Sequence, residues 1–178
     1  MARRVVHIFI FLALACSIPA MAFEEGLSSG NSAPNFNGNY TTGEAFSLGS
    51  LEKRPKVISF FWMRNISCIK SLTEIARIEK KHNAAKFIYV NLGEEKAETV
   101  QAFINNLPVR PSAVVLAAPS VKGQYLFSNF PHTVFLDENN KVKMVISGNS
   151  EEKYRKLDMD IARMETGQHM NEMLEKME

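Results

Sequence analysis

The stretch KVISFFWMRNISCIKSLTEI, residues 56–75, decides the fold because an apolar run passes directly into a helical pattern. Its first part, Lys56 to Trp62, is apolar after the lysine except for Ser59, as in strands that are buried on both faces. From Ser67, which we expect to cap a helix, to about His82, apolar and charged side chains fall on opposite sides of a helix. The pattern therefore predicts a buried strand followed by an amphipathic helix that lies on a sheet.

The elements on either side extend this pattern along the chain. We expect further elements in this order: short strands at 35–37 and 45–48, a strand at 86–91, a helix at 94–106, a short strand at 112–117, a helical turn at 121–125, hairpin strands at 133–137 and 141–147, and a helix at 151–164. We expect Thr166 and Gly167 to end that helix before a last helical segment. The strand–helix–strand–helix order in the middle is typical of parallel strand pairing.

Length and composition indicate one globular domain. The chain has 178 residues, of which 46% are hydrophobic and 22% are charged, which excludes a disordered or fibrous protein. We divide it into a signal peptide (1–22), a lead-in (23–31), an α/β domain (32–165) and a C-terminal helical extension (166–178).

The N-terminus has the features of a secretory signal peptide. Arg3 and Arg4 precede an apolar run at 5–15 that is too short to span a bilayer, and Ala20-Met21-Ala22 offers a cleavage site. An alternative is lipoprotein processing with Cys16 acylated, the one case in which we expect a membrane anchor. Both alternatives predict an exported, periplasmic protein.

The mature chain has a balanced charge and a single thiol. Cleavage after Ala22 removes two arginines from 21 basic residues, leaving 19 basic against 19 acidic residues, so we expect no nucleic-acid partner. It also removes Cys16, which leaves Cys68 alone in a compartment that favours disulfides. An unpaired cysteine there is either buried or kept for reaction.

Four local motifs in this order resemble the exported thioredoxin-like proteins of the TlpA and ResA type, within the redoxin superfamily. They are APNF at 33–36 with the following TGEAFSLGSLEKRPKVISFFW, SCIKSLTE at 67–74, NFPHTVFLD at 129–137, and FLDENNKVKMVISG at 135–148. The resemblance covers residues 32–164. It implies a thioredoxin-like α/β fold with a central mixed β-sheet, flanking helices and an N-terminal β-hairpin.

The resemblance also implies site residues. Cys68, Ser71 and Glu74 match the spacing of the C-x-x-C-x-x-E motif, with serine in place of the second cysteine, and Pro131 matches the proline that is cis in this fold. The chain departs from the motif F-W-x-x-W-C, because Met63 to Ser67 put two more residues between Phe-Trp and the cysteine, and Ser67 replaces the second tryptophan. The site has therefore been remodelled.

Thiol–disulfide exchange through Cys68 is the leading functional hypothesis. At the first turn of a helix, free N–H groups and the helix dipole favour a thiolate, so we expect a lowered pKa. Ser71 cannot form a disulfide, so an external thiol reductant has to release a disulfide-bearing or thiol protein partner. Glu74 is the family's acidic residue near the thiols, or it pairs with Lys70 or Arg77 on the helix surface.

Two other functions remain open. In a non-catalytic module, Cys68 is a small core residue and the loop Phe130-Pro131-His132 binds an extended peptide. His132 is then a surface residue at a strand start rather than a proton donor. The third function, a one-cysteine peroxidase, has weaker support, because Asn65 stands where such enzymes need threonine, although Arg64 offers an anion-stabilising group.

The C-terminal segment METGQHMNEMLEKME, residues 164–178, contains soft metal ligands. His169, Met170, Met173 and Met177 have the chemistry to bind Cu(I). The methionines and Leu174 also recur with the spacing of one helix face, so we predict a packing face. We expect no metal and no cofactor.

Overall fold

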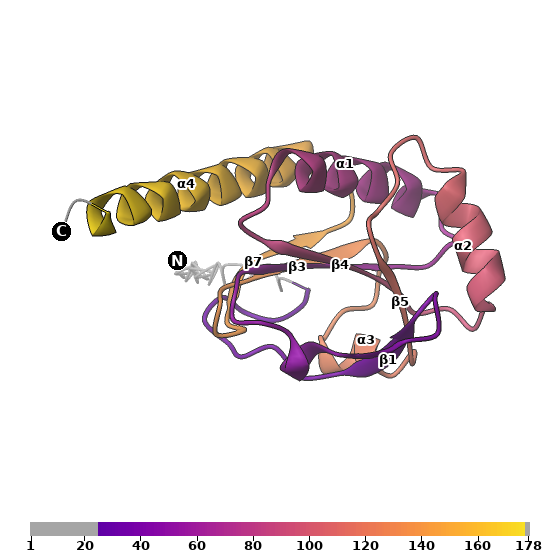
Figure 1. The fold of residues 1–178 in the computed structure, drawn as a ribbon. Coiled ribbons are helices and arrows are strands. Elements are labelled where there is room, and N and C mark those ends of the chain that lie inside the picture. The colour runs from indigo at the N-terminus through magenta and orange to yellow at the C-terminus, as the bar shows by residue number, and fades with distance from the viewer. Residues whose placement is uncertain (1–24, 177–178) are drawn as a thin grey trace, which may run out of the picture.

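The computed structural model describes residues 25–176, which form one seven-stranded sheet covered on both faces (Figure 1). The predicted signal peptide and Cys16 lie outside the described residues. The strands are β1 (Asn37–Tyr40), β2 (Ala45–Ser47), β3 (Lys56–Phe61), β4 (Lys86–Asn91), β5 (Val114–Ala117), β6 (His132–Leu136) and β7 (Val142–Ser147). The helices are α1 (Ser67–Lys81), α2 (Ala97–Asn105), α3 (Val121–Gln124) and α4 (Glu151–Glu175), with a 3-10 turn at Leu48–Ser50.

Strand β3 lies in the interior of the sheet, whose order is β2-β1-β5-β4-β3-β6-β7. All six residues of β3 are buried, as the apolar run predicts. It pairs in parallel with β4 and antiparallel with β6, so the sheet is mixed. Strands β1 and β2 pair antiparallel, with Asn37 opposite Ser47, and form the expected N-terminal hairpin.

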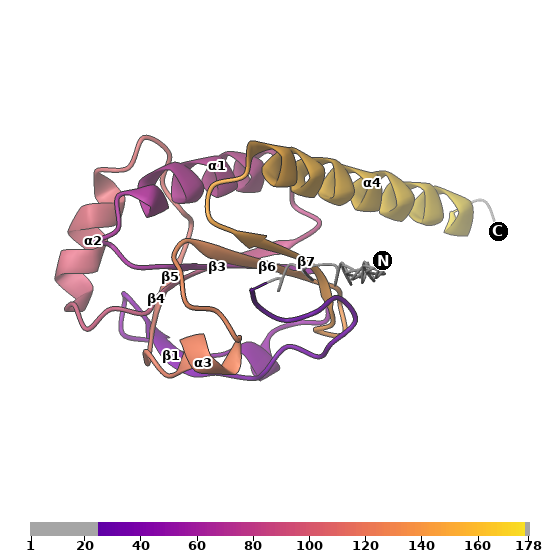
Figure 2. The same ribbon diagram turned by 180° about the vertical axis from the view of Figure 1, so that it is seen from behind.

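The sheet separates two hydrophobic cores because neighbouring side chains of β3 point to opposite faces. Val57 and Phe61 pack against α1 and α4, where Leu72 and Leu157 are fully buried. On the other face, the Phe60 ring contacts the Tyr125 ring at a centroid distance of 4.7 Å. Figure 2 shows α1 and α4 together on one side of the sheet and α3 on the other.

His82, the C-cap of α1, binds α4 to the domain. Its Nε2 lies 2.7 Å from Asp158 Oδ1 and its Nδ1 lies 2.7 Å from Glu165 Oε2. Glu165 also accepts the backbone N–H groups of Asn83 and Ala84. This cluster anchors the middle of α4 on the domain.

The C-terminal helix differs from the sequence prediction. We expected Thr166 and Gly167 to break it, but α4 runs without interruption to Glu175. A glycine inside a helix costs only about 1 kcal/mol relative to alanine, and the Thr166 hydroxyl donates to the carbonyl of Ala162 within the same helix. Within residues 25–176, no helix combines the length and the apolar character needed to cross a membrane.

Candidate functional site

The N-cap residue of helix α1 is Ile66 rather than Ser67, and the side chain of Asn65 bonds to the helix start. Ser67 is already the first helical residue, and its N–H donates to Asn65 Oδ1 at 3.0 Å. The N–H of Cys68 donates to the Asn65 backbone carbonyl at 2.9 Å. The prediction of a Ser67 cap is therefore wrong, because Ser67 lies inside the helix and its own N–H is satisfied by Asn65 on the tight turn after β3.

Asn65 also joins the helix start to the proline loop. Its Nδ2 donates to the backbone carbonyl of Phe130 at 3.2 Å. The peptide bond between Phe130 and Pro131 is cis, as the resemblance implies, and the Pro131 carbonyl accepts the N–H of Gly148 at 2.8 Å. The structure thus brings the start of α1 and the predicted peptide-binding loop together.

Cys68 is fully buried in the core between the sheet and α1. Burial raises the pKa of its thiol to about 11, although a hydrogen bond with the backbone of Trp62 acts in the opposite direction. The expectation of a lowered pKa is therefore wrong. The helix start does favour a thiolate, but loss of hydration in the core outweighs it.

Ser71 is also fully buried, and its oxygen already has a partner. The hydroxyl of Tyr154, on α4, donates to Ser71 Oγ at 2.8 Å. Burial raises the pKa of Tyr154 to about 12, so this hydroxyl stays protonated at neutral pH. Tyr154 was not among the predicted site residues, since it lies 83 positions from Ser71 and no local motif marks it.

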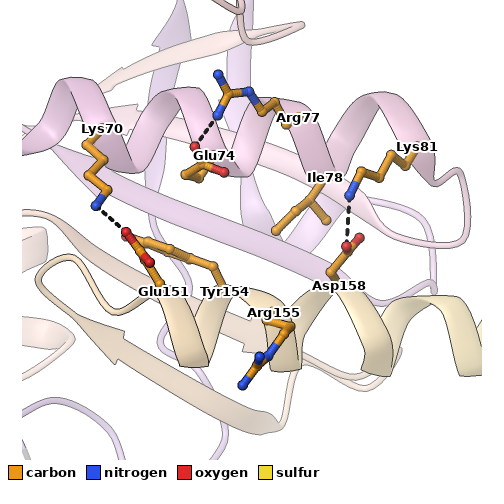
Figure 3. A pocket seen from close by; sticks show the side chains of 9 residues that line it. All are labelled: Lys70, Glu74, Arg77, Ile78, Lys81, Glu151, Tyr154, Arg155 and Asp158. Atoms are coloured by element: carbon orange, nitrogen blue, oxygen red, sulfur yellow. Dashed lines mark hydrogen bonds and ion pairs between the residues drawn. The ribbon is translucent and has the colours of Figure 1, made fainter.

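Glu74 lies on the outer side of α1 and pairs with Arg77, one of the two partners expected for a surface role. It borders a pocket of about 320 Å³ between α1 and α4 (Figure 3). Lys70–Glu151 at 2.6 Å and Lys81–Asp158 at 2.9 Å bridge the two helices there. The surroundings of Glu74 are thus those of a surface ion-pair network.

His132 is buried, so the expectation of a surface histidine is wrong. Its ring stacks on Phe127 with a centroid distance of 4.2 Å, and its Nδ1 lies 3.2 Å from Ser147 Oγ. Among the described residues its Nε2 has no hydrogen-bond partner. Burial lowers the pKa of His132 to about 4, although nearby Glu25 acts in the opposite direction.

His132 is therefore expected to make the protein acid-labile. Its pKa is about 4 in the folded protein and 6.5 in the unfolded chain, so stability is full above pH 6.5 and is lost as the pH falls from 6.5 to 4. The loss from this residue is at most about 3 kcal/mol. His132→Phe keeps the stacked ring and cannot take up the proton. The variant should lose less unfolding free energy than wild type between pH 7 and pH 4, measured by urea denaturation.

An exposed histidine provides the control for this prediction. His169→Gln should leave the acid loss unchanged, because His169 lies on the exposed C-terminal part of α4. Equal acid losses in wild type and His132→Phe would contradict the assignment to His132.

The lead-in residues reach the loop that precedes Pro131. The carboxylate of Glu25 accepts hydrogen bonds from the Ser128 hydroxyl and from the backbone N–H groups of Ser128 and Asn129. Chiefly through the Ser128 hydroxyl, these bonds lower the pKa of Glu25 to about 2. Gly26 N–H donates to the Leu126 carbonyl at 3.0 Å. A segment that we expected to be only an extended lead-in therefore braces the proline loop.

Trp62 and Ile66 stand just before α1, and Leu126 and Phe130 stand in the segment that leads to Pro131. We call these four apolar side chains the apolar rim. Ile66 is 82% exposed, Leu126 is 63% exposed and Trp62 is 40% exposed, while Phe130 is half-buried. Counted without gaps from Phe61-Trp62, the motif F-W-x-x-W-C puts its cysteine at Ile66. The two extra residues between Trp62 and Cys68 were visible in the sequence. The exposure of Ile66 and the burial of the Cys68 sulfur were not.

One side of the rim adjoins a polar cleft of about 470 Å³ beside the ends of β3 and β4. Glu95 accepts a hydrogen bond from Trp62 Nε1 at 3.3 Å and pairs with Arg64 Nε at 3.2 Å. These contacts hold the Trp62 indole in place. They also pair Arg64, the anion-stabilising group of the peroxidase hypothesis, with a carboxylate. Among the described residues, no group of three or more His, Cys, Asp or Glu side chains is arranged to hold a metal ion.

Comparisons with solved structures identify the fold of the chain. No protein-family model matches the chain, and no curated protein does. Among solved structures, it is similar to a candidate protein disulfide isomerase from Bacteroides thetaiotaomicron (TM-score 0.70, 22% identity, 83% of this chain and 98% of that chain). It is also similar to a candidate thiol:disulfide interchange protein DsbE from Chlorobium tepidum (0.68, 20%, 78% and 98%) and to StoA from Bacillus subtilis (0.57, 20%, 71% and 96%). The chain therefore has the thioredoxin-like fold that the motifs imply.

Proposed function

We propose that the chain is a non-catalytic thioredoxin-fold module that binds an extended peptide segment of a partner protein at the apolar rim. One observation carries this proposal: the only described thiol, Cys68, is buried with a raised pKa, while Ile66, two residues before it, is exposed at the start of α1. The predicted signal peptide puts this module outside the cytoplasm, in the periplasm.

The rim has the physical features of a peptide site. It presents exposed apolar side chains beside the backbone of the loop at Phe130, and burying one such side chain contributes about 1.5–3 kcal/mol. Asn65 and Glu25 hold the loop from its two sides, so little ordering is needed on binding.

Monothiol exchange through Cys68 is the second candidate function. It is favoured by the position of Cys68 in the first turn of α1 and by the names of the similar solved structures. In this reaction the Cys68 thiolate attacks a partner disulfide, forms one new S–S bond and releases the other partner sulfur as a thiolate. An external thiol then attacks the mixed disulfide, frees Cys68 and becomes disulfide-bonded to the partner. The first step requires a local opening that exposes the sulfur.

A peptide-binding experiment separates the two functions. A random dodecapeptide library is selected on the full-length mature protein, and the affinity of an enriched peptide without cysteine is measured by calorimetry. We expect Ile66→Asp to weaken binding by at least about tenfold, because a carboxylate would be desolvated in an apolar contact.

The matched control is Cys68→Ala, which should leave the affinity within about twofold of wild type, since the sulfur does not reach the rim surface. Failure to enrich any peptide, or equal binding by wild type and Ile66→Asp, would contradict the binding proposal. A disulfide-linked partner that forms with wild type and disappears in Cys68→Ala would instead support exchange.

A further inference from the structure

The loop before Pro131 directs four hydrogen-bond donors at one carboxylate, that of Glu25. The donors are the backbone N–H groups of Ser128 and Asn129, the Ser128 hydroxyl and, at 3.3 Å, the side-chain Nδ2 of Asn129. Successive backbone N–H groups that point to one place form a common kind of anion-binding site. We call these four donors the carboxylate site.

The charges near the carboxylate site also favour an anion. Lys122 Nζ lies 5.6 Å from the centre of the Phe130 ring, and Phe130 directly follows the site in the chain. Among the described residues Lys122 has no acidic partner. The hydrogen bonds of the site, chiefly that from the Ser128 hydroxyl, lower the pKa of Glu25 to about 2. At neutral pH the site therefore holds an ionised carboxylate.

The backbone of the lead-in is held in place without the Glu25 side chain. Gly26 N–H donates to the Leu126 carbonyl at 3.0 Å, and Gly30 N–H donates to the Val142 carbonyl at 2.8 Å. The bonds from Glu25 to the loop are exposed to solvent. Rotation of this one side chain therefore empties the carboxylate site without moving the backbone, and a carboxylate of another molecule can replace it.

We propose that the carboxylate site binds an aspartate or glutamate side chain of the partner peptide, and that Glu25 occupies the site while no peptide is bound. This inference rests on the proposed function. Two residues of the apolar rim, Leu126 and Phe130, lie on either side of Ser128 and Asn129 in the chain. A peptide that contacts Phe130 therefore comes within one residue of the site. The partner segment that fits this surface has an acidic residue close to an apolar one.

Exchange of one carboxylate for another keeps the loop satisfied. The peptide carboxylate takes up the donors that Glu25 leaves, so no N–H group of the loop loses a partner. Glu25 lowers the observed affinity for an acidic peptide, because the site is free only for a fraction of the time. The lead-in thus acts as an internal competitor for acidic partners.

Titration of the mature Glu25→Ala protein with N-acetyl-glutamate amide tests the carboxylate site alone. This probe has no apolar side chain, so its binding does not depend on the rim. We expect saturable shifts of the Ser128 and Asn129 amide signals in NMR spectra, with a dissociation constant of about 1–50 mM. The uncharged N-acetyl-glutamine amide should give no saturable shift. Wild type should bind the glutamate probe at least about tenfold more weakly, because Glu25 competes at a high effective concentration.

A peptide experiment tests the exchange. The dodecapeptide library is selected on Glu25→Ala, and an enriched peptide is compared by calorimetry with its analogue in which the acidic residue is replaced by the corresponding amide. We expect Glu25→Ala to bind the acidic peptide at least about tenfold more tightly than the analogue, and at least about fivefold more tightly than wild type does. The analogue should bind both proteins equally, since it does not compete with Glu25, and this equality shows that the rim is intact.

The outcomes distinguish this inference from the proposed function. If the glutamate probe does not shift the Ser128 and Asn129 signals, or the glutamine probe shifts them equally, the carboxylate site is refuted whatever the rim binds. Enriched peptides without an acidic residue would support the rim and overturn the exchange. Saturable probe binding without any enriched peptide would support the carboxylate site and contradict the binding function.

Discussion

Native Cys68 is expected to react with iodoacetamide at pH 7 at least about a hundred times more slowly than the same cysteine in the unfolded chain. The thiolate is the reacting species, and burial raises the thiol pKa from 9.0 to about 11, which lowers the thiolate fraction about a hundredfold. Complete burial of the side chain reduces access further. Mass spectrometry of timed aliquots, with and without guanidinium chloride, gives the two rates.

An exposed cysteine in the same fold provides the control for this measurement. In the variant Ile66→Cys, Cys68→Ala the only thiol of the mature chain stands at the most exposed position of the rim and should react at close to the free rate. If native Cys68 reacts as fast as this control, or titrates below about 8.5, the sulfur is accessible and the exchange function gains over the binding function.

Local patterns predicted a sheet with parallel strands and flanking helices, and the resemblance of four motifs implied its thioredoxin-like form. The apolar run of β3 and the helical pattern of α1 together require a sheet with a helix laid on it, and the alternation that follows leaves few topologies. The element bounds were less accurate: α2 begins at Ala97 rather than 94, and β5 begins at Val114 rather than 112. The ends of elements depend on caps and loops, which propensity describes poorly.

The site was harder to predict because its properties come from distant contacts. The N–H of Cys68 donates to the carbonyl of Asn65, whose side-chain amide bonds to Phe130, 65 residues away. His132 is buried because it stacks on Phe127 and faces Gly26 of the lead-in, where an added Cβ would lie 2.7 Å from the ring. Neither contact has a signature in the local sequence, so a helix-start thiol and a strand-start histidine both looked more accessible than they are.

The C-terminal part of α4 shows the converse limit. Helical spacing predicted a packing face from Met170, Met173, Leu174 and Met177, but the first three are exposed and Met177 lies outside the described residues. Periodicity tells which side chains share a helix face and does not say what that face meets.

Replacing Ile66 and Ile69 by cysteine, in a Cys68→Ala background, is expected to convert the module into a dithiol–disulfide enzyme. Residues three apart on a helix have Cβ atoms about 5–6 Å apart, within reach of a disulfide after small adjustments. Ile66 is exposed, whereas Ile69 is partly buried against the core, so one sulfur would attack and the other would resolve. An exposed thiol at position 66 would not be desolvated by burial. The start of α1 should therefore lower the pKa of this attacking thiol.

The reaction to measure is the reduction of insulin disulfides by dithiothreitol. Wild type should not accelerate it above the uncatalysed rate, because its single thiol is buried and no second cysteine can resolve a mixed disulfide. The dicysteine variant should accelerate it at least about tenfold, and Ile66→Cys alone should accumulate a mixed disulfide with insulin instead of turning over. Turnover by wild type would show that Cys68 already works as a catalytic thiol. If the dicysteine variant is inactive although it forms its internal disulfide, the rim does not present a partner's disulfide to residue 66, and the peptide site lies elsewhere on the fold.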